Sequence, residues 1–135
     1  MSKIYLDGEN NILGRLGSFA AKKLLQGNEV VIINSEKVLI SGSERDVVGK
    51  IKEVRGKGGA SQKGPKISKL ADRLLKRKIR GMLPRMKTKG REAFKRLRCE
   101  IGNSLTEEES KNLIKLEHRI PAKFVKLSRV VELLR

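Results

Sequence analysis

The chain has 135 residues, about the length of one domain. Apolar residues make up 38% and charged residues 35%, a composition typical of a folded protein that is neither membrane-embedded nor disordered. Its single cysteine and single histidine exclude an intrachain disulfide framework and leave too few soft ligands for a structural zinc site. The first residues lack the hydrophobic stretch of a signal peptide, so we expect a cytosolic protein. The formal net charge of +17 indicates an anionic partner.

The positive charge is concentrated in the middle third of the chain. Residues 1–49 hold six bases and six acids, residues 50–98 hold nineteen bases and three acids, and residues 99–135 hold seven bases and six acids. A neutral body with one basic block is typical of a protein that binds nucleic acid. We therefore expect a single domain, residues 1–135, made of a neutral α/β body (1–54), a basic RNA-binding segment (55–98) and C-terminal strand and helices that complete or flank the body (99–135).

Apolar patterning in the first third predicts alternating strands and helices. Three-to-four spacing of apolar residues predicts a helix that ends at Gly27, and Ser43 stands where the N-cap of a second helix is expected. A strand, helix, strand order indicates a βαβ crossover and a parallel sheet. The predicted elements are strands over residues 4–6, 30–33 and 38–40 and helices over residues 12–26 and 44–54.

The middle third begins with a cationic loop. Residues 55–66 contain four glycines and a proline, which no helix or central strand accommodates. Because its cations have few acids nearby, we expect this loop to be ordered only when an anion is bound. Ser68 is predicted to cap a basic helix over residues 69–80, which Gly81 and Pro84 end, and a second basic helix is predicted over residues 91–97.

The last third is predicted to add a strand and two helices. Residues 97–101 alternate weakly as a strand, and Thr106 to Glu109 form a capping box that opens a helix to about residue 117. Residues 124–127 are predicted to be extended, and Ser128 is expected to cap a terminal helix.

Catalytic chemistry is poorly supported by these residues. His118 is predicted at a helix end or surface, and Cys99 is predicted to be an unreactive, packed thiol. The glycine-rich loop lacks the Gly-Lys-Ser/Thr ending of a P-loop, and Gly14 and Gly17 lack the spacing of a dinucleotide fingerprint. We expect no enzyme, no catalytic residue, no metal, no cofactor and no small-molecule substrate.

Among the possible polyanions, the sequence favours structured RNA. The sequence has no helix-turn-helix, zinc-finger or zipper pattern, and its basic helices lack the apolar face that membrane-surface helices use. The four aromatic residues are spaced like core residues, which argues against a base-stacking single-strand module. They are Tyr5, Phe19, Phe94 and Phe124.

Four ordered motifs carry a resemblance to a known family. They are Asp7 with Ile12–Gly17, Val30–Val38 with Ser41 and Gly42, Arg80-Gly-Met-Leu-Pro-Arg85, and Lys89-Gly-Arg-Glu-Ala-Phe-Lys-Arg-Leu97. Their order resembles the universal large-subunit ribosomal protein L-thirteen family. The short connection from Leu25 to Val30 lacks the insertion of bacterial members, so the chain is similar to the archaeal and eukaryotic form.

The resemblance implies a three-layer α/β/α fold around a small parallel sheet, with basic loop and helical extensions. It also implies a structural constituent of the large subunit, in the cytoplasmic ribosome, that binds large-subunit ribosomal RNA, supports assembly and has neighbouring ribosomal proteins as partners. By motif, the RNA-facing residues would be Arg80, Arg85, Lys89, Arg91, Lys95 and Arg96, with Arg15 and Lys37 as further candidates. Charge alone adds Arg55, Lys57, Lys63 and Lys66.

Three questions stay open at this stage. A free-standing basic RNA-binding chaperone or regulator would carry the same charge pattern, and an RNA-acting enzyme would depend on His118 or Cys99. Met82 and Leu83 either pack against the body or press on a base edge. The resemblance gives no role for residues 104–135.

Overall fold

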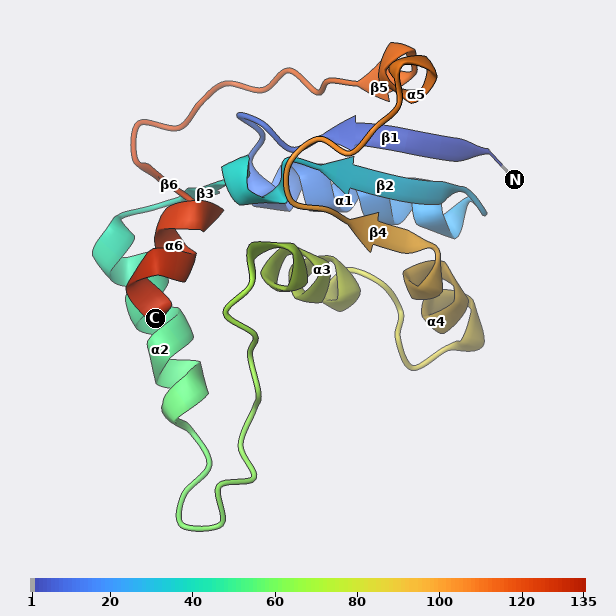
Figure 1. Ribbon diagram of the computed structural model, residues 1–135. Helices are drawn as coiled ribbons and strands as arrows, with labels where there is room; N and C mark the ends of the chain where they lie inside the picture. The colour runs from blue at the N-terminus through green and yellow to red at the C-terminus, as the bar shows by residue number, and fades with distance from the viewer. Residues whose placement is uncertain (1) are drawn as a thin grey trace.

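The central sheet of the computed structural model has four parallel strands in the order β4-β2-β1-β5 (Figure 1). The structure describes residues 2–135, and Met1 lies outside them. The first crossover runs from β1 (Lys3–Asp7) through α1 (Leu13–Leu25) to β2 (Glu29–Ile33), as the βαβ prediction requires. The outer strands are short: β4 (Leu97–Cys99) pairs with β2, and β5 (Leu113–Ile114) pairs with β1.

Alternating side chains along the strands divide the core between the two faces of the sheet. Leu6, Val30 and Ile32 point into the main core, whereas Tyr5 and Val31 point to a second, smaller cluster. The main core is covered by α1, α3 (Ala71–Gly81) and α4 (Thr88–Lys95). The opposite face is covered more thinly, by the chain around Leu105 and by α5 (Glu107–Lys111). The three-layer α/β/α prediction is confirmed.

A two-stranded antiparallel sheet and two helices form the other end of the molecule. Its strands are β3 (Leu39–Ser41) and β6 (Phe124–Lys126), which follow the 3₁₀ turn η1 (Ser35–Lys37) and the long C-terminal connection respectively. The helices α2 (Glu44–Gly56) and α6 (Leu127–Leu134) pack against each other beside this small sheet. Residues 104–135 therefore complete both sheets, because they supply β5 to one and β6 to the other.

Tertiary pairing shifts three of the predicted boundaries. The predicted strand 97–101 ends at Cys99, and the predicted helix 91–97 becomes α4, which begins at Thr88 and ends at Lys95, since Leu97 pairs with Val30 in the sheet. The helix predicted to reach residue 117 ends at Lys111, because Leu113 pairs with Tyr5.

Two predicted caps and one predicted core residue were wrong. Ser68 does not cap α3: its hydroxyl accepts from the Leu70 amide in a local turn, and the helix begins at Ala71. Ser128 lies inside α6, whose N-cap is Lys126. Phe124 is 44% exposed because it lies on a short edge strand, where its side chain faces away from Val125 and the core.

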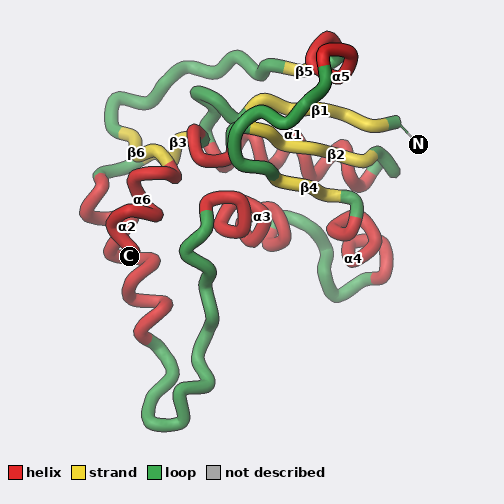
Figure 2. The backbone as a smooth tube through the Cα atoms, viewed as in Figure 1, coloured by secondary structure: helices red, strands yellow, loops and turns green. Residues whose placement is uncertain are grey.

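The longest excursion from this body is the connection between α2 and α3. Figure 2 shows it as a loop that extends well away from the sheet and returns to α3, and the shorter α3–α4 connection projects on the same side of the molecule. Both excursions belong to the basic middle third of the sequence. No helix within residues 2–135 is long and apolar enough to cross a membrane.

Candidate nucleic-acid interface

Helix α3 separates apolar from cationic side chains. Leu74, Leu75 and Ile79 are buried against the main core. The three-to-four spacing that buries them leaves Arg73 and Arg77 on the exposed side of the helix. The helix therefore fixes a row of cations on the rigid body.

Carboxylates of the protein do not neutralise this basic surface. Within residues 2–135 there are three ion pairs, which join Lys37 to Glu9 and Arg129 to both Glu44 and Glu132. None of the three involves a cation of residues 50–98, although that segment holds nineteen Lys and Arg residues. A concentrated set of cations without counter-charges favours an external polyanion.

Two glycines allow the α3–α4 connection to lie directly on the helices. A Cβ atom at Gly17 of α1 would lie 2.9 Å from the sulfur of Met82. A Cβ atom at Gly90 of α4 would overlap the carbonyl group of Pro84. Leu83, between Met82 and Pro84, is 5% exposed. Residues of three of the four sequence motifs therefore pack together. Of the two interpretations of Leu83, packing against the body is the one that the structure shows.

This packing creates a groove that we call the α3–α4 groove. It consists of two adjoining hollows of about 310 and about 350 Å³ that share Arg80, Leu83 and Arg85. Arg77 and Gly81 line the first hollow, and the second is completed by Gly90, Arg91, Phe94 and Lys95. Four of the sequence-predicted RNA-facing residues therefore meet at one place: Arg80, Arg85, Arg91 and Lys95. Lys89 is exposed on α4 outside the hollow.

The glycine-rich loop forms a second cationic element with a fixed base. The guanidinium group of Arg55 donates to the carbonyl oxygen of Ile67, and Nη1 of Arg77 donates to that of Lys66 at 3.4 Å. The loop backbone encloses a hollow of about 230 Å³, with Lys57 and Lys66 on its lining and Lys63 exposed nearby on the same loop. Arg55 thus holds the loop closed, while the lysines remain exposed.

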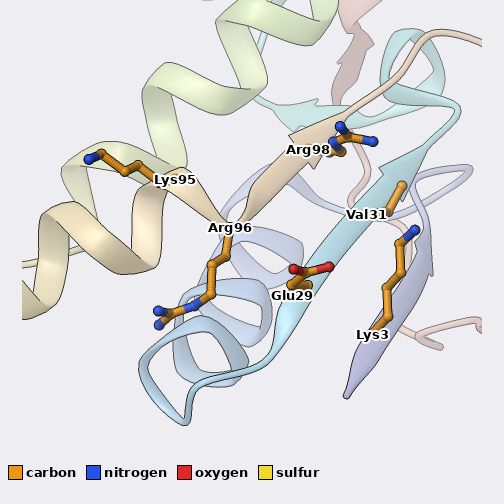
Figure 3. A pocket seen from close by; sticks show the side chains of 6 residues that line it. All are labelled: Lys3, Glu29, Val31, Lys95, Arg96 and Arg98. Atoms are coloured by element: carbon orange, nitrogen blue, oxygen red, sulfur yellow. The ribbon is translucent and has the colours of Figure 1, made fainter. Parts of the chain in front are cut away.

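Arg96 has a partner inside the protein. Its Nη2 donates to the carbonyl oxygen of Leu24 at 2.7 Å, at the C-terminal turn of α1, where a cation is favoured by the helix dipole. Figure 3 shows Arg96 turned toward this helix, Lys95 directed away from it, and Arg98 farther along β4. The hollow that these residues line has a volume of about 280 Å³, and Lys3 and Glu29 line it as well.

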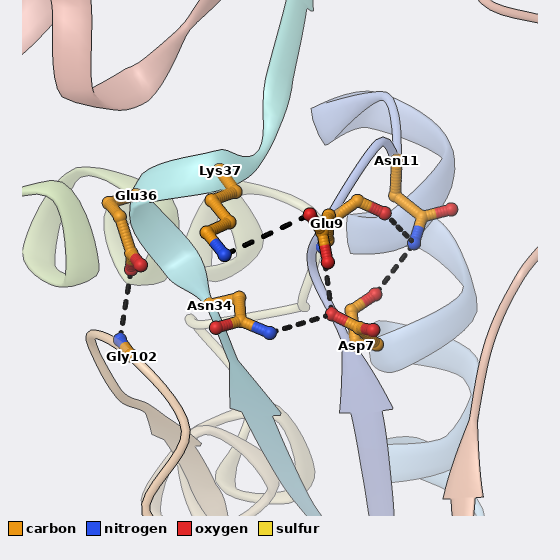
Figure 4. A network of polar contacts seen from close by, with 7 residues as sticks. All are labelled: Asp7, Glu9, Asn11, Asn34, Glu36, Lys37 and Gly102. Atoms are coloured by element: carbon orange, nitrogen blue, oxygen red, sulfur yellow. Dashed lines mark hydrogen bonds and ion pairs between the residues drawn. The ribbon is translucent and has the colours of Figure 1, made fainter.

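The other two candidates lie on separate parts of the body. Arg15 is exposed on α1. The ammonium group of Lys37 lies 3.8 Å from Glu9, beside the carboxyl ends of β1 and β2. Figure 4 shows the polar network there, in which Asn34 donates to the buried carboxylate of Asp7 at 3.0 Å. This network holds the two strand ends together.

Neither residue considered for catalysis lies in a catalytic arrangement. Burial raises the pKa of the Cys99 thiol to about 12, which keeps it protonated and agrees with the predicted unreactive thiol. His118 lies in the extended connection before β6 rather than at a helix end, and its Nε2 is buried without a hydrogen-bond partner. Among the described residues there is no group of three His, Cys, Asp or Glu side chains that could hold a metal ion.

Sequence reasoning did not select Arg77, which lines the groove, or Arg98, which is exposed on β4. Helical spacing could have found Arg77, because a residue three positions before Arg80 lies on the same face of α3. The alternation predicted for residues 97–101 could have found Arg98, because it places Arg98 on the face opposite Leu97 and Cys99.

Comparison with known proteins agrees with the four motifs. Residues 2–105 match the family model described as "Ribosomal protein L13". "Large ribosomal subunit protein uL13" of Picrophilus torridus is 40% identical over 135 residues, covering 97% of this chain and 96% of the relative. The protein of the same name from Methanocaldococcus jannaschii is 40% identical over 131 residues, with 93% and 92% covered. That from Natronomonas pharaonis is 38% identical over 129 residues, with 96% and 88% covered. The family predicted from the motifs is confirmed: the chain belongs to the ribosomal protein L13 family.

Proposed function

We propose that the protein is a structural constituent of the large ribosomal subunit that binds large-subunit ribosomal RNA and supports the assembly and stability of the subunit. Its relatives carry the name of a large ribosomal subunit protein and match nearly the whole chain. In this role the protein acts in the cytoplasmic ribosome, and other proteins of the subunit are its neighbours. It performs no catalysis.

One observation carries the proposal of RNA binding. The cations of residues 50–98 form no ion pair with a carboxylate anywhere in residues 2–135. Phosphate groups would supply the missing counter-charge, and binding them would release counterions from the RNA. Because α3 and α4 pack on the sheet, their cations meet the RNA at fixed positions rather than on flexible chains.

The candidate residues divide by position into three sets. The α3–α4 groove contributes four phosphate-binding cations, and Lys89 extends this set along α4. The lysines of the glycine-rich loop form the second set, with Arg55 holding the base of the loop. Arg15, Lys37 and Arg96 form the third set: each is proposed to contact RNA at the edge of the interface, Lys37 and Arg96 with a protein partner already in place.

We propose one folding domain over residues 1–135. The neutral body supplies the two central strands of the main sheet, the basic segment contributes α3, α4 and β4 to the main core, and the last third completes both sheets. Because α3 packs against both α1 and α6, the binding segment is expected to unfold together with the body.

Sedimentation of a native lysate tests the proposed function. The protein should migrate with the large subunit at about 0.1 M monovalent salt and remain there at about 0.5 M, because many buried phosphate contacts resist screening. Recovery in the light fractions at the lower salt would contradict a structural role. It would favour the free-standing RNA-binding chaperone or regulator, which binds RNA by exchange.

A variant with four substitutions assigns the binding to the groove. Arg80, Arg85, Arg91 and Lys95 are changed to Ala, and the matched control changes Lys22, Lys111, Lys123 and Arg135 to Ala, four exposed cations outside both the groove and residues 50–98. We expect the groove variant to leave the large subunit at about 0.5 M salt and the control to stay bound. Release of the control variant with retention of the groove variant would place the interface outside the groove.

A further inference from the structure

The larger hollow of the α3–α4 groove has an apolar floor beneath its cationic rim. Among its lining residues, Leu83 and Gly90 are buried and Phe94 is half-buried, so they form the floor, whereas the exposed Arg85 and Arg91 form the rim. Its volume of about 350 Å³ lies in the range of small-ligand sites, roughly 300–1,000 Å³. Phosphate binding alone needs no such floor, since phosphate oxygens gain nothing from apolar contacts.

Phe94 is held in a defined position within this hollow. It is half-buried and packs against the main core beside Ala93, which is fully buried. The ammonium group of Lys76 lies 5.2 Å from the centroid of its ring, a favourable cation–π contact. Phe94 is therefore anchored, and as a half-buried residue it also lines the hollow, unlike a residue that belongs wholly to the core.

We propose that this hollow receives one unstacked nucleobase of the RNA, with the phosphates on either side of that nucleotide held by the cations of the rim. The proposal rests on the proposed RNA-binding function, and it identifies an unstacked base as the feature of the RNA that the groove recognises. Unstacked bases in loops and bulges stack on aromatic rings and on guanidinium planes, and both are present here. A fully paired helix, in contrast, presents only its phosphates and ribose edges to such a groove.

Charge complementarity favours a nucleotide over a side chain of a neighbouring protein. An apolar side chain would fill the floor but would leave Arg80, Arg85, Arg91 and Lys95 without counter-charges, since none of them is paired with a carboxylate in the described part of the chain. A nucleotide brings the flat face of an aromatic base and flanking negative charges together in one group, and so matches floor and rim at once.

Photo-cross-linking tests the occupant directly. Phe94→p-azidophenylalanine retains the ring and adds an azide at its para position. The full-length variant is bound to large-subunit ribosomal RNA of the same organism and irradiated. Phe124→p-azidophenylalanine is the matched control, because Phe124 is 44% exposed on β6 rather than in the groove. We expect the residue-94 adduct to map to one unpaired nucleotide, and the residue-124 variant not to label that nucleotide. An adduct confined to paired nucleotides, or no RNA adduct while the complex forms normally, would overturn the proposal.

Binding measurements separate this proposal from the proposed function. Phe94→Leu should weaken binding to the same RNA about tenfold, equivalent to about 1.4 kcal/mol, without changing the dependence of affinity on salt. Phe124→Leu should leave affinity unchanged. Equal affinities for wild type and Phe94→Leu would overturn the base-binding proposal and leave phosphate binding intact, whereas a wild-type protein that does not bind this RNA would contradict the proposed function itself. If Phe94→Leu lowers the melting temperature enough to unfold the protein, the cross-link decides, because its variant keeps the ring.

Discussion

Removing single cations from the α3–α4 groove should change how strongly salt weakens RNA binding. Arg85 and Arg91 are both exposed at the rim, and neither is joined to a carboxylate within residues 2–135. In the proposed complex they neutralise phosphates. Arg85→Ala and Arg91→Ala should therefore weaken RNA binding while leaving the fold intact, since exposed substitutions of this kind alter stability by only about 0.5 kcal/mol.

The magnitude follows from counterion release. Each lost phosphate contact reduces the slope of log affinity against log salt by roughly 0.7 to 0.9, so each single variant should lower it by about one unit and the double variant by about two. The control is Arg129→Ala. Arg129 is also exposed, but its guanidinium group lies 3.1 Å from Glu132 and 3.5 Å from Glu44, so it has protein counter-charges and should not change the slope.

Filter binding with large-subunit ribosomal RNA over a range of monovalent salt measures this slope. Circular dichroism of each variant checks that the fold is retained. An unchanged slope and affinity for both groove variants would refute the placement of the phosphate contacts. A fall in slope for Arg129→Ala as large as that of the groove variants would show that the absence of a protein counter-charge does not identify a phosphate-binding cation.

Three further predictions concern the body that supports the groove. Gly90→Ala should destabilise the protein by about 1–3 kcal/mol, seen as a lower melting temperature, because its methyl group would overlap the Pro84 carbonyl, whereas Gly14→Ala, with open space, should not. Cys99 should resist thiol-specific reagents at about pH 8 until the protein unfolds, since burial raises its pKa to about 12. The Tyr5 hydroxyl donates a hydrogen bond to the Glu109 carboxylate at 2.7 Å and lowers the pKa of that carboxyl. The stability contributed by this bond is therefore full above the ordinary glutamate pKa and is lost as pH falls through the lowered pKa. Thermal melts of Tyr5→Phe should show a smaller loss of stability toward acid pH than the wild type.

The sheet and its first crossover could be predicted because their signals are local. The run from Val30 to Ile33 is apolar throughout because both faces of β2 are covered, and the spacing of Leu16, Ala20 and Leu24 gives α1 one buried face. Helix α3 was predicted on the same grounds. These elements need no knowledge of distant residues, since each carries its own period, although α3 begins at Ala71 rather than after the predicted cap Ser68.

The last third was predicted less well because its structure depends on distant partners. Residues 113–114 form a strand only because β1 offers a free edge, and that pairing ends α5 six residues before the boundary predicted from its capping box. Likewise, Phe124 pairs with Ser41 in a sheet of two short strands, which leaves its ring exposed. A capping box marks where a helix begins, but the sheet determines where this one ends.

The same distinction explains how far sequence could define the candidate site. Charge counting identified the cations but could not say what each one faces, because a cation's partner is set by the fold. Lys95 and Arg96 are adjacent and equally basic, yet Lys95 lines the groove, whereas Arg96 donates to Leu24, 72 positions away, at the end of α1. The groove floor was equally hidden, since it exists only where Gly90 lets Pro84 approach α4 and Phe94 keeps part of its ring outside the core. Sequence can therefore name the segment that is proposed to bind a polyanion, and the fold decides which of its cations are free to do so.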